Sequence, residues 1–596
     1  MGVTAGPSTG GDAAAAARLD PRRLAMSVPG VVAARTYQRE WLPRDIIAGL
    51  VLASLLVPQG MAYAELAGLP PITGLYTSIL CLIGYALFGP SRILVLGPDS
   101  SLGPMIAATV LPLVAADGDP TLAVAYGSAL ALVVGAVILI GAKAGLGFIA
   151  DLLSKPTQIG YMNGLALTIF VGQLPKLFGF STDAEGLFGE ASAFVKGVAN
   201  GEAVGAAVAI GIGSLVLLII FQRFLPKLPG VLVVVVLAMV AAAVLDLASR
   251  GVSLVGVLPS GLPPLTIPRI VPHDIVPLFA GALGIAVVSL ADTISTSSAF
   301  ATRTGQEVKP TQEMVGIGAA NVAAGFFQGF PVSTSGSRTA VAERAGAKSQ
   351  LTGLVGAAVI AAMLVLLPGL FQYLPQPTLG AVVIVAALSL ADIPATQRLW
   401  RQRRTEFWLA MAGFAGVAVF GVLPGIAIAV ILSILGVFRR AWEPYRTTLG
   451  KVPGMRGYHD IRMYPEAETP PGLVIYRFDG PLIFANARTF RDEIRVLART
   501  DPPPRWILVA AEPMTDVDTT AADMLEELDD ELEAGGTELV FAEMKDAVRE
   551  KIKSYGLEWQ RDRTAFYPTV GSAVHAFGAV HLVDDDDVRP TPPSAT

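Results

Sequence analysis

Long apolar segments, separated by short polar connections, occupy most of this chain of 596 residues. A helix needs about 20 apolar residues to cross the hydrocarbon core of a bilayer. The composition agrees with membrane spans, because 53% of the residues are hydrophobic and only 15% are charged, whereas soluble chains carry about 25% charged residues. The sequence therefore predicts a polytopic α-helical membrane protein with about fourteen transmembrane helices, near 45–63, 72–89, 98–114, 122–142, 157–178, 203–222, 229–248, 276–300, 312–328, 336–346, 350–371, 377–392, 405–421 and 423–439.

The positive charges of the connecting loops predict the orientation. If the N-terminus is cytoplasmic, the loops after even-numbered spans should carry Lys and Arg. They do, at Arg92, Lys143, Lys155, Arg223, Lys227, Arg303, Lys309, Arg344, Lys348, Arg398, Arg401, Arg403 and Arg404. The opposite loops hold few, and no short apolar region with a cleavage site opens the chain. We therefore expect a multi-pass protein of the cytoplasmic (inner or plasma) membrane, with both termini in the cytoplasm and no removable signal peptide.

The last quarter of the chain has a different composition. From Lys451 onward it carries 27 acidic and 16 basic residues, and the preceding 450 residues carry a net charge of +5. Strand-like runs at Leu473–Phe478 and Trp506–Ala510 alternate with helical periodicity, which predicts a cytoplasmic α/β domain. We expect a cytoplasmic N-terminal segment, a transmembrane transport domain, a linker, the α/β domain and a disordered acidic, Pro-containing tail, at 1–43, 44–440, 441–465, 466–582 and 583–596.

The sequence argues against several classes of protein. The single cysteine, Cys81, excludes a disulfide framework and a thiolate metal site, and the four histidines show no ligand spacing. No Ser/His/Asp triad or phosphate-binding loop occurs, and no basic patch is interleaved with aromatic residues. We therefore expect no enzyme, no metal site, no cofactor and no nucleic-acid partner.

The third and tenth spans are conspicuously short, and each begins with a run rich in Gly, Pro and Ser. Irregular backbone at membrane depth is tolerated only where it is buried in protein or lines a cavity. Two such breaks in corresponding halves indicate the transport site of an inverted-repeat carrier. Each half-helix N-terminus carries about half a positive elementary charge, so two that face one another form an anion site. The runs are Gly97-Pro98-Asp99-Ser100-Ser101-Leu102-Gly103-Pro104 and Gly329-Phe330-Pro331-Val332-Ser333-Thr334-Ser335-Gly336-Ser337-Arg338.

Two charged residues inside spans are candidates for function. Arg338 lies just inside the tenth span, where an arginine costs about 2.5–3.5 kcal/mol at the bilayer centre, and we interpret it as the counter-charge of an anion. An interfacial arginine paired with Glu343 or a lipid phosphate is the alternative. Asp292, in the eighth span, must be protonated, paired or ion-bound. It either exchanges a proton or binds Na⁺ together with Ser295 and Thr296, unless the carboxylate is purely structural.

Four further polar residues are candidates for function. Asp99, with Ser100 beside it, is either a proton acceptor or a cap of the following helix. Gln59 and Tyr63 share one face of the first span, four residues apart, and suit a lined cavity. The nearby Pro58 and Gly60 are expected to loosen this helix.

In the tail, Thr519 and Thr520 open a predicted helix. We expect one of the two to cap it, with regulated phosphorylation as the alternative.

Several of these motifs together resemble the sulfate permease (SulP) family of inorganic anion transporters, and the tail resembles the STAS domain. The resemblance covers about residues 40–580. It rests on Pro58-Gln59-Gly60-Met61-Ala62-Tyr63-Ala64, Leu66-Ala67-Gly68-Leu69-Pro70-Pro71-Ile72-Thr73-Gly74-Leu75-Tyr76-Thr77-Ser78, Phe88-Gly89-Pro90-Ser91-Arg92, Gly97-Pro98, Gly318-Ala319-Ala320-Asn321 and Ser337-Arg338-Thr339-Ala340.

The resemblance implies fourteen helices in a 7+7 inverted repeat. A core of spans 1–4 and 8–11 would carry the anion and move like an elevator against a gate of spans 5–7 and 12–14. Motif matching places Gln59, Tyr63, Asp99, Ser337 and Arg338 around the substrate and Asp292 as the coupling carboxylate, and STAS domains imply a homodimer. Asp99 departs from the family pattern, because many members have a small or apolar residue there, and this favours a cation-coupled variant. Ala521 replaces the usual Gly of the STAS phosphorylation pattern, which weakens a phosphorylation switch at Thr519 or Thr520.

The sequence thus favours a secondary active transporter for a small anion, sulfate-like, bicarbonate-like or a small dicarboxylate, coupled to H⁺ or, second, Na⁺. Its expected partners are the anion, membrane lipid, a second copy and a STAS-binding regulatory protein. Three alternatives stay open: a nucleobase-type H⁺ symporter of the same architecture, an uncoupled anion channel, and a membrane-anchored STAS regulatory protein.

Overall fold

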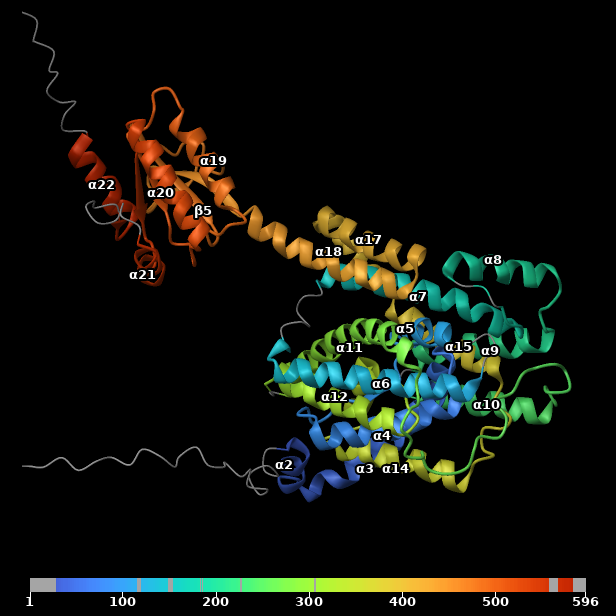
Figure 1. Ribbon diagram of the computed structural model, residues 1–596. Coiled ribbons are helices and arrows are strands. Elements are labelled where there is room, and N and C mark those ends of the chain that lie inside the picture. Colours follow the sequence, from blue (N-terminus) through green and yellow to red (C-terminus); the bar gives the residue numbers. More distant parts are fainter. Residues whose placement is uncertain are drawn as a thin grey trace, which may run out of the picture. The chain divides into compact units, whose positions relative to one another are not determined.

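The computed structural model describes residues 28–114, 119–147, 154–182, 184, 186–225, 228–304, 307–556 and 566–581 (Figure 1). The predicted tail at 583–596 and the first 27 residues of the predicted N-terminal segment lie outside these ranges. The chain forms two compact units, Met1–Ser433 and Ile434–Thr596.

The first unit is helical, and every predicted span is a helix. The fourteen are α3 (Leu42–Leu66), α4 (Pro71–Phe88), α5 (Gly103–Val110), α6 (Pro120–Lys143), α7 (Lys155–Phe178), α9 (Gly205–Phe224), α10 (Gly230–Val244), α11 (Ile275–Thr304), α12 (Pro310–Phe326), α13 (Gly336–Arg344), α14 (Leu351–Leu366), α15 (Gln376–Leu390), α17 (Arg404–Phe420) and α18 (Val422–Trp442). Short helices that the apolar pattern did not predict are α2 (Pro29–Arg35), α8 (Gly186–Ala199) and α16 (Ile393–Gln402).

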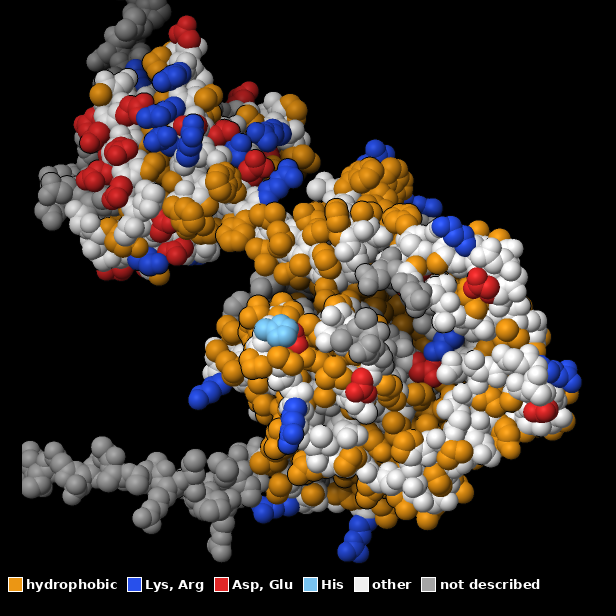
Figure 2. Space-filling view, turned by 45° about the vertical axis from the view of Figure 1, so that its right-hand side comes forward, with side chains coloured by type: hydrophobic (Ala, Val, Ile, Leu, Met, Phe, Trp, Pro, Cys, Tyr) orange, Lys and Arg blue, Asp and Glu red, His pale blue; other side chains and the backbone are white. Residues whose placement is uncertain are grey.

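Many of these helices have the length and hydropathy of membrane spans. Within the described ranges, seven helical stretches are long and apolar enough to cross a membrane: Arg39–Leu66, Pro71–Phe88, Pro120–Lys143, Gly205–Phe224, Pro272–Thr302, Gln376–Gln402 and Val422–Trp442. Shorter apolar helices accompany them, among them Gly103–Leu113, which begins at the third span. Hydrophobic side chains dominate the visible face of this unit, whereas charged side chains of both signs cover the visible face of the second unit (Figure 2).

The helices of the first unit pack in two sets. The helices α3, α4, α6, α11, α12 and α14 pack mainly on one another, and α7, α9, α15 and α17 do the same. Within the first set, α3 crosses α4 at Gly60 and Gly74, where a Cβ atom on Gly74 would lie 1.9 Å from the Gly60 carbonyl oxygen. The helix α3 continues through Pro58, whose missing N–H removes one backbone hydrogen bond, and Gly60 allows close packing on Gly74.

The second unit contains a six-stranded sheet. Its strands are β3 (Tyr445–Gly450), β4 (His459–Asp460), β5 (Leu473–Asp479), β6 (Trp506–Ala510), β7 (Glu538–Ala542) and β8 (Phe566–Tyr567), in the order β4-β3-β5-β6-β7-β8. The strands β5 to β8 are parallel, and β3 is antiparallel to both of its neighbours. The predicted linker at 441–465 therefore contributes two strands to the domain. The strand β4 is at the sheet edge and has two residues, and β3 beside it is polar, so neither shows the apolar run of a central strand.

Helices cover both faces of this sheet. The helices α19 (Ala487–Ala498), α20 (Thr519–Ala534) and α21 (Asp546–Ser554) pack on one face, where Phe478, Val509 and Phe541 are fully buried. On the other face, Phe577 of α22 (Val570–His581) packs against Trp506, with ring centroids 5.5 Å apart. Because successive residues of a strand point to opposite faces, Ile507 and Val509 of β6 pack on the first face and Leu508 and Ala510 on the second, and the whole strand is buried.

Candidate functional site

A two-stranded ribbon brings the two interrupted segments together. The strands β1 (Leu96–Gly97) and β2 (Ser333–Thr334) pair in antiparallel fashion, with Leu96 opposite Thr334. Each strand leads into a short helix, β1 into α5 and β2 into α13. The ribbon therefore places the starts of both short helices, with their positive partial charges, in one region of the protein.

Polar side chains of three long helices hold the second segment in place. Asn321 of α12 accepts a hydrogen bond from the Val332 backbone N–H at 3.0 Å, and Ser289 of α11 donates to the Val332 carbonyl at 2.9 Å. Thr77 of α4 accepts from the Phe330 N–H at 3.1 Å. These bonds satisfy backbone groups that no regular helix or sheet would pair at this depth. Sequence reasoning did not assign these supports, although a polar residue inside an apolar helix, such as Asn321, was the available signal.

Arg338 is the most buried charged residue of the site, since its side chain is 1% exposed. Its Nη1 donates to the carbonyl of Pro98 at 2.5 Å, and its Nη2 lies 3.4 Å from Asp99 Oδ2. Its Nε is buried and has no hydrogen-bond partner among the described residues. The guanidinium thus joins the two interrupted segments and keeps one buried N–H donor free, and it pairs with Asp99 rather than with Glu343.

The glycine at position 97 makes room for this guanidinium. A Cβ atom at Gly97 would lie 3.2 Å from Arg338 Nη1 and 3.3 Å from Leu56 Cδ2. Both contacts are tighter than ordinary van der Waals packing, so a larger residue would displace the arginine.

A hydroxyl group links the two aspartates of the site. Asp99 Oδ1 accepts hydrogen bonds from the Ser101 N–H at 3.0 Å and from Ser101 Oγ at 2.8 Å. The same Oγ lies 3.2 Å from Asp292 Oδ2 of α11. The resulting chain runs from Arg338 through Asp99 and Ser101 to Asp292. Ser101 was not predicted as a site residue, because only the fold shows that one hydroxyl reaches both carboxylates.

The other predicted residues lie at different distances from this series of hydrogen-bonded side chains. Tyr63, 5% exposed, lies beside Ser100 and near Asp99 and Arg338. Thr296 borders the start of α13, since a Cβ atom at Gly336 would lie 3.8 Å from its Oγ1. Ser337 is exposed and hydrogen-bonds Ser335, the residue that caps α13. Gln59 is half-buried and Ser295 is exposed, and neither side chain forms a hydrogen bond within the described part of the site.

In the tail, the predicted cap is wrong. Asp518 caps α20, because its Oδ1 accepts the N–H of Ala521 at 2.8 Å and its Oδ2 accepts that of Phe484 at 2.7 Å. A carboxylate is as good a cap as a hydroxyl, and it precedes both threonines in the chain. Thr519 and Thr520 are exposed in the first turn of the helix.

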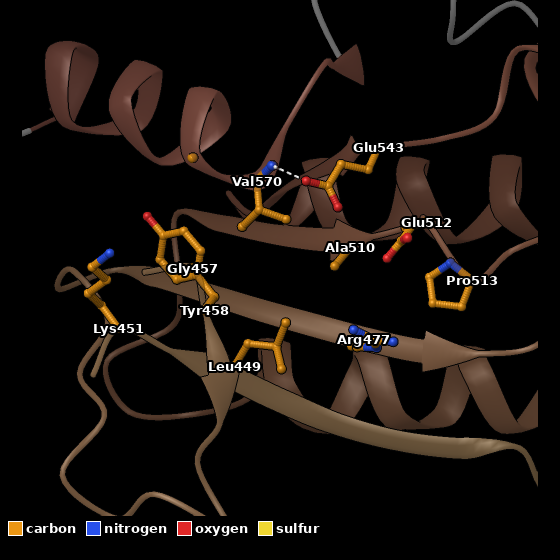
Figure 3. Close-up of a pocket in the computed structure, with 11 residues that line it drawn as sticks. Leu449, Lys451, Gly457, Tyr458, Arg477, Ala510, Glu512, Pro513, Glu543 and Val570 are labelled. Atoms are coloured by element: carbon orange, nitrogen blue, oxygen red, sulfur yellow. Dashed lines mark hydrogen bonds between the residues drawn. The ribbon is translucent and has the colours of Figure 1, made fainter. Parts of the chain in front are cut away.

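The tail also contains a pocket of about 320 Å³ that neither threonine lines (Figure 3). Lys451 and Tyr458 lie at one end, and Arg477, Glu512 and Glu543 line the rest. A hydrogen bond to Asp479 at 2.6 Å raises the pKa of Arg477, and Glu512 and Glu543 act in the same direction. The charges of the pocket thus largely balance one another.

The fold is that of a helical multi-pass membrane protein with a second, α/β unit, and comparisons with known proteins identify the class as an anion transporter with a STAS domain. The model of the sulfate permease family matches residues 42–413, and that of the STAS domain matches residues 464–573. A probable sulfate transporter of Mycobacterium tuberculosis is 41% identical over 550 residues, which cover 92% of this chain and 98% of that protein. The chloroplastic sulfate transporter 4.1 of Arabidopsis thaliana is 30% identical over 91% of this chain and 81% of its own length.

Solved structures show the same fold. Murine solute carrier 26 family member A9 in the inward-facing state aligns with a TM-score of 0.86 and 22% identity, over 96% of this chain and 97% of that one. The transmembrane domain of the cyanobacterial bicarbonate transporter BicA aligns with a TM-score of 0.58 and 20% identity, over 66% of this chain and 98% of that one. The chain belongs to the sulfate permease family.

Proposed function

We propose that the chain is a secondary active transporter that carries a sulfate-like or bicarbonate-like anion, or a small dicarboxylate, through the site at Arg338. The observation that carries the proposal is the free Nε–H donor of Arg338, which is buried between two helix N-termini. An unpaired buried donor is costly, by about 1–3 kcal/mol, and an anion oxygen would satisfy it. The relatives named sulfate transporters and the similar bicarbonate transporter support these anion classes.

The same geometry supports coupling to a proton. Asp99 offsets the charge of Arg338 at 3.4 Å, so an ionised Asp99 weakens the attraction of this site for an anion. Ser101 has one hydroxyl hydrogen but lies within hydrogen-bond distance of a carboxylate oxygen on each side, at 2.8 and 3.2 Å. Both contacts are hydrogen bonds only when one carboxyl carries a proton and donates it to Ser101. Proton and anion then favour each other's binding, as linkage requires. Na⁺ bound by Asp292, Ser295 and Thr296 is the second candidate.

The proposal also includes an elevator motion. The core set of helices (α3, α4, α6, α11, α12 and α14) would move against the gate set (α7, α9, α15 and α17), with both termini in the cytoplasm. In the described part of the chain, one ion pair joins the two sets: Lys176 of α7 with Glu65 at the end of α3. Rigid sliding of one set would break it. The ion pair joins the ends of two long side chains, so a disulfide is too short to replace it. A reducible bifunctional thiol cross-linker between Glu65→Cys and Lys176→Cys should therefore arrest uptake reversibly, whereas a disulfide between Ser214→Cys and Thr378→Cys, whose hydroxyls lie 3.1 Å apart within the gate, should not. Uptake that continues with the first pair cross-linked would contradict the elevator.

Uptake into proteoliposomes tests the transport function itself. Labelled sulfate, bicarbonate and a dicarboxylate are offered with an inward H⁺ gradient, an inward Na⁺ gradient or neither. We expect accumulation of one anion, faster with the H⁺ gradient. Competition by uracil or xanthine would favour a nucleobase symporter, and single-channel currents would favour a channel.

Absent flux from folded protein would favour a regulatory platform, which a pull-down of a STAS-binding partner would support. Homodimerisation, which we propose from the STAS domain, is checked by the mass of the detergent-solubilised protein.

A further inference from the structure

The short helix α16 connects two apolar helices, α15 and α17, and carries a cluster of arginines. Ten residues of α-helix span about 15 Å, and this one contains Arg398 and Arg401, followed directly by Arg403 and Arg404. Its arginines would be costly in the hydrocarbon core, so the apolar part of the stretch Gln376–Gln402 is α15, and α16 forms the turn between α15 and α17. We infer that this turn lies at the membrane surface.

Buried contacts fix α16 on the protein. Asn163 of α7 accepts the Asp392 N–H at 2.8 Å and donates to Thr396 Oγ1 at 2.9 Å. Ala395 and Leu399 are buried in a small apolar cluster with residues of α7 and α17. These contacts fix one face of α16 against the protein, and its other faces are exposed.

Those remaining faces differ in chemistry. Ile393 and Trp400 share one flank and are 54% and 45% exposed, and Trp408 of α17 is 63% exposed. At 100° per residue, Arg401 lies on the side away from the buried Ala395 and Leu399, whereas Arg398 lies on the flank opposite Trp400. Exposed tryptophan beside arginine is typical of the boundary between acyl chains and headgroups.

The arginines of this cluster are available for a negatively charged ligand. Arg403 pairs with Glu406 at 3.3 Å. Among the described residues, Arg398, Arg401 and Arg404 have no carboxylate partner, and Arg404 stacks on the Trp400 ring, 5.2 Å from its centroid. Three guanidinium groups within seven residues thus leave an uncompensated positive charge at this turn, and those of Arg401 and Arg404 border the exposed apolar flank.

We propose that α16 binds the headgroups of anionic phospholipids, with the acyl chains lying along Ile393 and Trp400. Guanidinium groups bind phosphate oxygens in a bidentate fashion. A phospholipid covers the apolar flank and the cationic face at once, whereas a free phosphate would leave Ile393 and Trp400 exposed. Through α16, such a site attaches the gate set of helices to anionic lipids of the membrane.

Quenching of tryptophan fluorescence by brominated lipids tests this site on the full-length protein. The protein is reconstituted into bilayers that mix phosphatidylcholine with phosphatidylglycerol, and bromine is placed on the acyl chains of one lipid at a time. The difference between wild type and Trp400→Phe isolates the signal of Trp400. We expect brominated phosphatidylglycerol to quench Trp400 more strongly than brominated phosphatidylcholine at equal mole fraction.

The arginines are then tested by substitution. In Arg398→Gln/Arg401→Gln the preference for phosphatidylglycerol should fall about five-fold for each arginine removed, and 1 M salt should weaken it in the wild type. Arg462→Gln/Arg488→Gln removes the same charge from the STAS domain and should leave it unchanged.

Equal quenching by both lipids in the wild type would overturn the proposal, and this comparison needs no variant to fold. An unchanged preference in Arg398→Gln/Arg401→Gln, or displacement of the lipid by inorganic phosphate at constant ionic strength, would overturn it as well.

Discussion

Replacing Arg338 by glutamine separates its two roles, as partner of Asp99 and as donor to the anion. At 3.4 Å and an effective dielectric constant of about 20, the attraction between the two charges is about 5 kcal/mol. Removing one member of a buried pair costs about 3–5 kcal/mol, because the other charge stays buried and unpaired. Protonation of Asp99 relieves part of this cost, so we expect Arg338→Gln to destabilise the protein by about 3 kcal/mol.

The double variant distinguishes stability from binding. Asp99→Asn/Arg338→Gln leaves no unpaired charge, so most of the lost stability should return. Anion affinity should fall about 10- to 100-fold in Arg338→Gln, the value of a lost charged hydrogen bond, and should stay low in the double variant. Asp99→Asn alone should bind the anion at least as tightly as wild type, because Arg338 then has no fixed counter-charge.

Thermal unfolding, followed by tryptophan fluorescence at several anion concentrations, measures stability and anion affinity in one assay. A ligand that binds the folded state raises Tm as its concentration increases. The reasoning is refuted if Arg338→Gln keeps the anion-dependent rise in Tm. It is equally refuted if the double variant regains anion affinity together with stability.

Three further predictions follow from single contacts. Ser101→Ala removes the hydroxyl between Asp99 and Asp292. Uptake should then lose its dependence on an H⁺ gradient, while the KM for the anion changes little. An unchanged H⁺ dependence would exclude Ser101 from the coupling. Asp45 is fully buried and accepts five hydrogen bonds, including two from the backbone N–H groups before α14, so Asp45→Asn should lower stability by about 1–3 kcal/mol for each donor left unpaired, as thermal unfolding would show. In the tail, hydrogen bonds from Thr447 and Tyr445 lower the pKa of Asp460. The ionised carboxylate therefore stabilises the β3–β4 pair at a pH above the pKa of Asp460 in the unfolded chain, and this stabilisation is lost as the pH falls. Acid should accelerate amide exchange in β3 less steeply in Asp460→Asn than in wild type.

The sequence predicted the elements that depend on long apolar runs. Each of the fourteen spans became a helix, and β5 and β6 lie where their apolar runs predicted strands. Elements without such runs were missed for a physical reason. The helix α16 is short and arginine-rich, so it resembles a polar loop. The strand β3 is polar and is held by pairing with β5, and β4 is a two-residue edge strand that pairs with β3.

The residues of the candidate site could be predicted from the sequence, but the contacts between them could not. The two Gly/Pro/Ser runs and the intramembrane charges are visible because each is costly in lipid without a compensating role. The partners are not visible, because Arg338 and Asp99 are 239 positions apart in the chain and Ser101 and Asp292 are 191 apart. No local periodicity encodes such contacts. The cap of α20 shows the same limit at short range, since Asp518, Thr519 and Thr520 are all competent caps.

Simultaneous measurement of anion and proton flux tests the central claim most directly. Full-length protein is reconstituted into liposomes that contain a pH-sensitive dye, and labelled anion uptake and internal acidification are recorded in the same vesicles. We predict that both rise together in a fixed ratio, and that at anion concentrations below KM both fall about 10- to 100-fold in Arg338→Gln. Anion uptake without acidification, or undiminished uptake in Arg338→Gln, would contradict the account.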